Sequence, residues 1–264
     1  MYLSGSWFTV GYLEGDYPRV IAHRGFALNH AENTLGAFQA ALDAGADILE
    51  TDVHLSKDGV VVVAHDPDLT RVARQPGLVS DFTYTELASI DLGFGEGFPS
   101  LEGLLRAFPD AKFHIDLKTR SAVEPFADVI RELNAEDRIL ATSFDEVTRQ
   151  AVVSLVPGVA SSASQSLVIR ARLRAWWGLP IDNWRVPPEV VALQIPPAMY
   201  GLALVTPSMI RLAKRRGLEV HVWTINDPDN MRRLWSMGVQ GIITDRTDLA
   251  VQVRSEMFPD PAHS

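Results

Sequence analysis

Two carboxylates and a histidine lie within one stretch of the sequence, ETDVHLSKDGVVVVAHD, which spans residues 50–66. Glu50 and Asp52 are two residues apart in a segment with strand character, so their side chains share one face. Two carboxylates on one face repel each other and lose hydration unless a cation lies between them. We therefore interpret both as candidate metal ligands. The alternative is a surface hairpin whose charges are simply solvated.

The same stretch is predicted to fold back on itself. Asp58-Gly59 is the strongest short-range signal for a β-hairpin, and the β-branched run from Val60 to Val63 follows it. Turning the chain at this point brings His65 to about the level of Asp52. The hairpin thus predicts a proton-transfer group beside the candidate metal ligands.

Further polar and aromatic residues close or follow predicted strands elsewhere in the chain. The segment Val20-Ile21-Ala22 is followed directly by His23, Arg24 and Gly25. The segment KFHIDL contains Asp116 near its end, and Lys118 follows two residues later. The residues at or near such strand ends are His23, Arg24, Glu50, Asp52, Asp116, Lys118, Trp223 and Asp245.

The elements that position these residues are eight strands, nearly all separated by helices. They begin near residues 20, 48, 112, 138, 158, 190, 219 and 241. About 250 residues with eight βα units predict a TIM (β/α)8 barrel. We expect one domain over 1–264, with its motif-bearing core at 20–248. A hairpin extension follows strand 2, and a short insertion at 67–99 precedes strand 3. A doubly wound sheet is the runner-up, but no GxGxxG follows the first strand.

This fold turns the scattered residues into one predicted site. In a TIM barrel, active residues lie at the carboxyl ends of the strands, which form one rim. A purely structural role would scatter polar residues over both ends of the barrel. Their placement at one end therefore favours a functional site.

The composition excludes several classes of protein. The 264-residue chain has a net charge of -9, which argues against a partner that presents a phosphate backbone, such as nucleic acid. It has no cysteine, so neither disulfides nor a thiolate zinc site can form. No apolar run approaches the length of a membrane span, and the first twenty residues lack the features of a signal peptide. We expect a cytoplasmic protein without stable membrane insertion, and a lead-in at 1–18 that packs along the outside.

Other residues that could do chemistry have simpler explanations. Four further histidines are expected at the surface or just behind the site: His30, His54, His114 and His221. Three tryptophans could form an apolar rim for a substrate but are more often packing residues: Trp176, Trp177 and Trp184. The run of Arg170, Arg172 and Arg174 favours a solvated helix face over a lipid-binding patch.

Several of these segments together resemble a known family. AHRG, ENTLGAFQAALDAGADILETDVHLSKDGVVVVAHD, IDLK, VWTIN and GIITD resemble the signature of the glycerophosphodiester phosphodiesterase family, from residue 20 to about 245. The resemblance implies a TIM barrel and one divalent cation, Mg²⁺ or Ca²⁺. It also implies the following roles: acid and base for His23 and His65, metal ligands for Glu50, Asp52 and Asp116, phosphate contacts for Arg24 and Lys118, and a wall of the site for Trp223.

Two positions depart from the family pattern. Ala31 stands where many members have proline before Glu-Asn-Thr, which changes only the stiffness of a turn. Asp116 stands where many members have glutamate. An aspartate is one methylene shorter, so it must lie closer to the cation or bind it through water.

These residues predict a small-molecule phosphodiesterase. A hard cation held by carboxylates neutralises the developing charge on a phosphodiester, while arginine and lysine add fixed positive charge. One histidine removes a proton from the nucleophile, and the other protonates the leaving alkoxide. The predicted reaction hydrolyses glycerophosphodiesters to sn-glycerol 3-phosphate and an alcohol.

Two alternatives stay open at this point. A lysophospholipase D-like activity is supported by Trp176, Trp177 and the long segment 67–99, because such a segment is often functional. A non-catalytic barrel that binds phosphodiesters is expected to lose a histidine or a metal carboxylate, and this chain keeps them. The sequence leaves open which histidine is the acid, which metal binds and how many copies associate.

Overall fold

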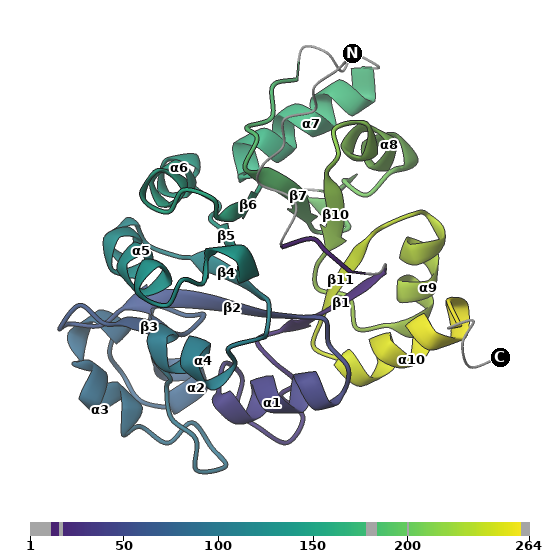
Figure 1. Ribbon diagram of the computed structural model, residues 1–264. Helices are drawn as coiled ribbons and strands as arrows, with labels where there is room; N and C mark the ends of the chain where they lie inside the picture. Colours follow the sequence, from purple (N-terminus) through teal and green to yellow (C-terminus); the bar gives the residue numbers. More distant parts are fainter. Residues whose placement is uncertain (1–11, 16–17, 178–183, 200, 260–264) are drawn as a thin grey trace.

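Eight parallel strands close into a barrel in the computed structural model, which describes residues 12–15, 18–177, 184–199 and 201–259 (Figure 1). The barrel strands are β1 (Arg19–His23), β2 (Ile48–Leu55), β4 (Phe113–Leu117), β5 (Ile139–Thr142), β6 (Ala160–Ser162), β7 (Val190–Ile195), β10 (Glu219–Val222) and β11 (Gly241–Thr244). Closure is complete because β1 pairs in parallel with both β2 and β11. The predicted TIM barrel is therefore confirmed, and each observed strand begins within two residues of its predicted start.

Helices form the outer layer and connect the strands. They are α1 (Leu35–Asp43), α4 (Leu101–Ala107), α5 (Val123–Glu132), α6 (Glu146–Leu155), α7 (Gln165–Trp177), α8 (Pro207–Arg215), α9 (Pro228–Ser236) and α10 (Thr247–Met257). Short 3-10 turns at Arg120–Ala122 and Glu136–Arg138 flank α5. Polar residues begin several helices, since the side chains of Thr34, Asp145 and Asp227 accept hydrogen bonds from amides of the first turn.

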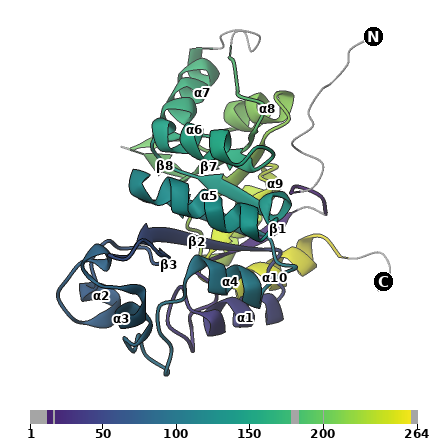
Figure 2. The ribbon, with the colours of Figure 1, turned by 60° about the vertical axis from the view of Figure 1, so that its left-hand side comes forward.

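The predicted hairpin and insertion are both present. Strand β3 (Val61–Val63) pairs antiparallel with β2, and the amide of Ala64 donates to the Asp52 carbonyl over 2.9 Å. The insertion that follows contains α2 (Thr70–Ala73), a 3-10 turn (Val79–Asp81) and α3 (Tyr84–Ala88), and Figure 2 shows it beside the barrel under β3. A second hairpin, β8 (Ala198–Met199) with β9 (Leu202–Ala203), follows β7 and was not predicted.

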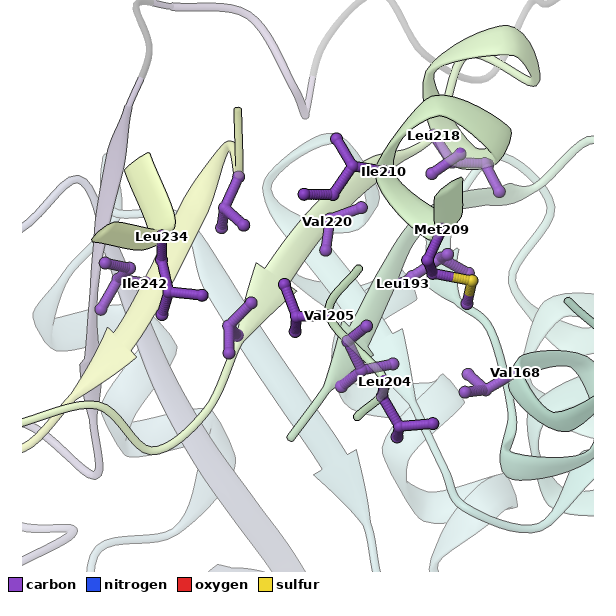
Figure 3. Close-up of a cluster of buried hydrophobic side chains, with 14 of the residues drawn as sticks. Val168, Leu193, Leu204, Val205, Met209, Ile210, Leu218, Val220, Leu234 and Ile242 are labelled. Carbon is purple, nitrogen blue, oxygen red and sulfur yellow. The ribbon is translucent and has the colours of Figure 1, made fainter. Parts of the chain in front are cut away.

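The packed layers explain why the barrel holds its shape. Aliphatic side chains of β7, β10 and β11 meet those of α7, α8 and α9, and Figure 3 shows Leu193, Val220 and Met209 within this cluster. Burying each such side chain stabilises the fold by roughly 1.5–3 kcal/mol relative to exposing it. The strands are thereby fixed to the helices, so their carboxyl ends hold a constant arrangement.

The lead-in segment packs differently from the expectation. Tyr12 is 2% exposed, and its hydroxyl donates to the Phe113 carbonyl across 3.2 Å. Lys112 Nζ donates to the carbonyls of Tyr12 and Glu14, at 2.8 Å each. Residues 12–14 therefore contact the amino-terminal end of β4 instead of lying outside, because the barrel interior offers a buried place for the aromatic ring. The rest of the lead-in, 1–11 and 16–17, lies outside the described residues.

Candidate active site

A pocket of about 300 Å³ opens at the carboxyl ends of the barrel strands. All eight residues predicted for the site line it: His23, Arg24, Glu50, Asp52, His65, Asp116, Lys118 and Trp223. The strand register places them side by side, since His23 lies beside Glu50 and Asp52 beside Asp116. The hairpin delivers His65 to the same rim, as its spacing predicts.

A tight turn after β1 aims Arg24 at the pocket. Arg24 and Gly25 both adopt positive φ angles, 57° and 83°. A side chain at Gly25 would meet backbone atoms of Ala37 in α1 at 2.7 Å, so only glycine fits there. The Arg24 amide donates to the Glu50 carbonyl over 2.9 Å. The turn thus fixes the arginine beside the carboxylates of β2.

The candidate metal carboxylates surround a lysine. Lys118 Nζ lies 2.7 Å from Asp52 Oδ1 and 2.6 Å from Asp116 Oδ2. Burial by itself would lower the pKa of Lys118, but the two carboxylates raise it overall. Burial also raises the pKa of Asp116, and burial together with Asp52 raises the pKa of Glu50 to about 8. Three carboxylates thus face one lysine and one arginine, and burial makes the charged forms of Glu50 and Asp116 costly.

The donor atoms fit a hard divalent cation. Asp52 Oδ2 and Asp116 Oδ1 are buried and accept no hydrogen bond. The raised pKa of Glu50 reflects its burial and the charge of Asp52, both of which a bound cation would offset. Within the described residues, however, no group of three His, Cys, Asp or Glu side chains is arranged as a metal site. The reason is geometric, because Lys118 lies between Asp52 and Asp116.

Each of the two candidate proton-transfer histidines is held by an aspartate. His23 Nδ1 lies 2.6 Å from Asp245 Oδ1, and His65 Nδ1 lies 2.6 Å from Asp66 Oδ1. A carboxylate on Nδ1 holds the proton there and leaves Nε2 to exchange a proton with a ligand. Burial lowers the pKa of His23, but the bond to Asp245 and the Glu50 charge raise it overall.

A chain of ion pairs connects the two sides of the pocket. Asp66 Oδ2 accepts from Arg71 Nε at 2.5 Å, and Arg71 donates twice to Glu32 at 2.6 and 2.7 Å. Glu32 also accepts from Arg24 Nη1 at 3.1 Å. Sequence reasoning missed the roles of Glu32, Asp66 and Arg71, and it gave Asp245 no role. The position of Asp66 directly after His65 could have predicted its role beside that histidine, whereas nothing in the sequence predicts the role of Arg71.

The opposite wall of the pocket is apolar. Residues from β5 to β9 and from the end of β10 form it: Phe144, Ala163, Val168, Ile195, Pro196, Met199, Leu204 and Trp223. The rings of Phe144 and Trp223 meet edge to face at 6.2 Å, and Lys118 Nζ lies 5.8 Å from the Phe144 centroid. One pocket thus offers a charged half and an apolar half.

The other four histidines of the described residues lie outside the pocket. His30 is half-buried and bonds Glu96 at 3.1 Å, while His54 is buried and its Nε2 bonds the His65 carbonyl at 3.0 Å. His114 and His221 are fully buried and stack at 5.2 Å. Of the two expected places, His54 lies just behind the site, because it bonds the backbone of His65, whereas His114 and His221 lie in the barrel interior. Inward-facing positions of parallel strands explain the last two.

Within the described residues, none of the features expected to form an apolar rim for a lipid substrate lines the pocket. No described residue of the segment 67–99 lines it, and Trp176 and Trp177 are exposed on α7 away from it. Trp184 is buried and packs in the core. Among the described residues, no helix is both long and apolar enough to cross a membrane.

A closed (β/α)8 barrel with two aspartate-held histidines, paired cations and clustered carboxylates at one rim defines an enzyme that acts on an anionic ester. The model of the glycerophosphoryl diester phosphodiesterase family matches residues 23–249. The chain belongs to this family, and it is an enzyme of the phosphoric diester hydrolase class.

Known proteins similar to the chain agree in length and fold. A probable glycerophosphodiester phosphodiesterase 2 of Mycobacterium tuberculosis is 37% identical over 243 residues, covering 91% of this chain and 92% of its own. The crystal structure of a glycerophosphodiester phosphodiesterase from Agrobacterium tumefaciens has a TM-score of 0.74 at 28% identity, covering 90% of this chain and 99% of its own. A human lysophospholipase D, GDPD1, is 27% identical and covers 86% of this chain and 82% of its own.

Proposed function

We propose that this enzyme hydrolyses glycerophosphodiesters to sn-glycerol 3-phosphate and an alcohol, with a divalent cation and two histidines. The observation that carries the proposal is the pair of His–Asp couples, His23–Asp245 and His65–Asp66, which flank one pocket. A reaction that deprotonates a nucleophile and protonates a leaving alkoxide needs two such groups. A solved structure from Oleispira antarctica, similar in fold with a TM-score of 0.74, holds sn-glycerol 3-phosphate as its product.

The cations of the pocket are suited to bind the phosphate. Arg24 offers a planar fork, and Lys118 offers a compact charge that Asp52 and Asp116 keep protonated. These two cations attract the anionic diester into the charged half of the pocket, where they offset the charge that repels a nucleophile.

Three carboxylates are proposed to hold the cation: Glu50, Asp52 and Asp116. Either Mg²⁺ or Ca²⁺ would supply a Lewis acid that stabilises negative charge on the phosphoryl oxygens. Asp52 Oδ2 and Asp116 Oδ1, which are buried and accept no hydrogen bond, support this assignment.

The histidines are proposed to move the protons. With a proton held on Nδ1 by its aspartate, each ring presents Nε2 to the pocket as a base, or as an acid once it is doubly protonated. Burial disfavours the protonated form of His23, but the bond to Asp245 and the charge of Glu50 outweigh it and raise the pKa of the ring above its ordinary value. The geometry is compatible with either assignment of acid and base.

The test is turnover of glycerophosphocholine, with sn-glycerol 3-phosphate measured as product. Activity should vanish after treatment with EDTA and return with Mg²⁺ or Ca²⁺. Release of glycerol 3-phosphate at an unchanged rate by exhaustively chelated enzyme would refute the metal assignment. Failure to release it under any metal condition would refute the reaction.

A lysophospholipase D-like activity is a second candidate, because the apolar half of the pocket can accept a hydrocarbon group. Val168, Met199 and Leu204 line that half. Comparing turnover of lysophosphatidylcholine with that of glycerophosphocholine decides between the two substrates. A non-catalytic barrel is set aside, since the chain belongs to an enzyme family and keeps both histidines.

A further inference from the structure

Helix α7 has an apolar face turned to solvent in addition to its buried face. Its inner side packs Leu167, Val168 and Ala171 against the barrel. Its outer side exposes a stripe at helical spacing that consists of Ile169, Leu173, Trp176 and Trp177. The two tryptophans are 59% and 72% exposed. An outer helix of a barrel normally turns polar residues to water, so this stripe needs a partner.

Positive charge surrounds the stripe. Residues 151–218 contain eight Arg or Lys and two Asp or Glu, a net charge of +6, whereas the rest of the chain carries -15. On α7, Arg170 is exposed and the Arg172 guanidinium lies 5.1 Å from the Trp176 ring centroid. Helix α8 lies next to α7 (Figure 1), and its residues Arg211, Lys214 and Arg215 are exposed. This sector is therefore the basic side of an acidic protein.

Helix α7 begins at the pocket and carries the stripe away from it toward solvent. Gln165 and Val168 in the first turns of α7 line the pocket, and Arg172 Nε donates to the Ala203 carbonyl of the β8–β9 hairpin at 2.9 Å. In that hairpin Met199 lines the pocket while Leu202 is exposed. Figures 1 and 2 show α7 extending outward from the barrel. A surface bound to α7 would thus lie beside the entrance to the active site.

We propose that the outer face of α7 docks the enzyme on an anionic lipid surface, together with Leu202 of the β8–β9 hairpin. These residues are here called the α7 patch: Ile169, Arg170, Leu173, Trp176, Trp177 and Leu202. Tryptophans insert at the boundary of headgroups and acyl chains, and arginines pair with anionic headgroups. A second copy of the chain fits less well, because a symmetric contact would place the same positive sectors against each other. The proposal that docking delivers single-chain lipids to the pocket rests on the proposed function, whereas the docking itself does not.

The experiment is co-sedimentation of the full chain with vesicles of phosphatidylcholine, with and without phosphatidylglycerol. The protein should bind the anionic vesicles at low salt, bind neutral ones far less, and dissociate as salt screens the arginines. No binding to anionic vesicles at low salt would overturn the proposal. A stable dimer in the absence of lipid would also overturn the proposal if substitutions in the α7 patch converted it to monomers. A second copy of the chain would then be what covers the patch.

Two variants and two matched controls locate the surface. Trp176→Ser combined with Trp177→Ser, and separately Arg170→Glu, should each weaken vesicle binding by about tenfold or more. Phe258→Ser, an exposed aromatic at the end of α10, and Arg233→Glu, an exposed arginine of α9, should bind like the parent. Equal binding by the α7 variants and the parent, or equal loss in the controls, contradicts the assignment.

Activity on a soluble substrate separates docking from catalysis. The α7 variants should hydrolyse glycerophosphocholine at the parent rate, because none of the changed residues lines the pocket. Vesicle binding is measured without turnover, so the result of the docking test is valid even if the enzyme prefers another diester as substrate. If the variants lose soluble turnover and vesicle binding together, α7 acts through the fold of the site and the docking proposal is wrong.

Discussion

Replacing Asp245 by asparagine tests whether the carboxylate on His23 positions it for proton transfer. Asp245 Oδ1 lies 2.6 Å from His23 Nδ1, and Asp245 Oδ2 accepts from Asn226 Nδ2 at 2.7 Å. An asparagine that keeps the bond from Asn226 must turn its own NH2 toward Nδ1. The histidine would then carry its proton on Nε2, which is the wrong tautomer for a base facing the pocket.

The size of the effect follows from the bond that is lost. A hydrogen bond to a charged group contributes about 1.5–3 kcal/mol. The Asp245 side chain is 51% exposed, so water weakens the interaction and the lower figure applies. We therefore expect kcat to fall about tenfold, since about 1.4 kcal/mol corresponds to a factor of ten. Holding His23 in the tautomer that is protonated on Nε2 would lower kcat further.

The assay is the pH profile of kcat/KM for glycerophosphocholine. Asp245 is the strongest influence that raises the pKa of His23 against its burial, so the Asp245→Asn variant should move one limb of the profile to lower pH. Asp248→Asn, a change at a surface carboxylate paired with Arg246, is the control and should leave the profile unchanged. Reduced kcat with both limbs in place would show that Asp245 supports the fold instead of His23.

Three further outcomes are expected. Asp116→Asn should raise the metal concentration needed for half-maximal activity, while Asp116→Glu should retain activity; an unchanged midpoint in the asparagine variant would show that Asp116 is not a ligand. His23→Ala and His65→Ala should each lower kcat by about 10²-fold or more, and His54→Ala much less, as measured on folded protein. Burial raises the pKa of Glu146, but the hydrogen bonds from Arg149 outweigh burial and lower this pKa to about 2. Its stabilising contribution is therefore complete above about pH 4.5 and is lost as the pH falls toward 2, so urea unfolding of a Glu146→Gln variant should depend less on pH in this window.

Local spacing determined most of the fold and the inventory of the site. Alternation along β2 put Glu50 and Asp52 on one face, and Asp58-Gly59 fixed the hairpin that returns His65 to their level. These relations join residues that are at most 15 positions apart in the sequence, from Glu50 to His65. Backbone geometry and turn chemistry fix such relations without help from the rest of the chain.

The tertiary structure alone decided which side chains pair. His23 meets Asp245 across 222 positions, and Arg71 meets Glu32 across 39. Lys118 lies between Asp52 and Asp116 because the register of β2 and β4 places those aspartates side by side. Such contacts exist only after the barrel closes, since closure sets the register of strands that are remote in sequence.

The burial of individual side chains is likewise decided by the tertiary structure and is not predicted by the local sequence. Tyr12 and His114 carry no local signal of their environment, yet their rings lie 5.9 Å apart in the barrel interior. The solvent-facing stripe of α7 is equally invisible in the sequence, because a tryptophan at helical spacing normally predicts packing. Which face of a helix meets the barrel depends on the neighbours that the fold supplies. That choice is made by the tertiary structure, after the sequence has determined that a helix forms.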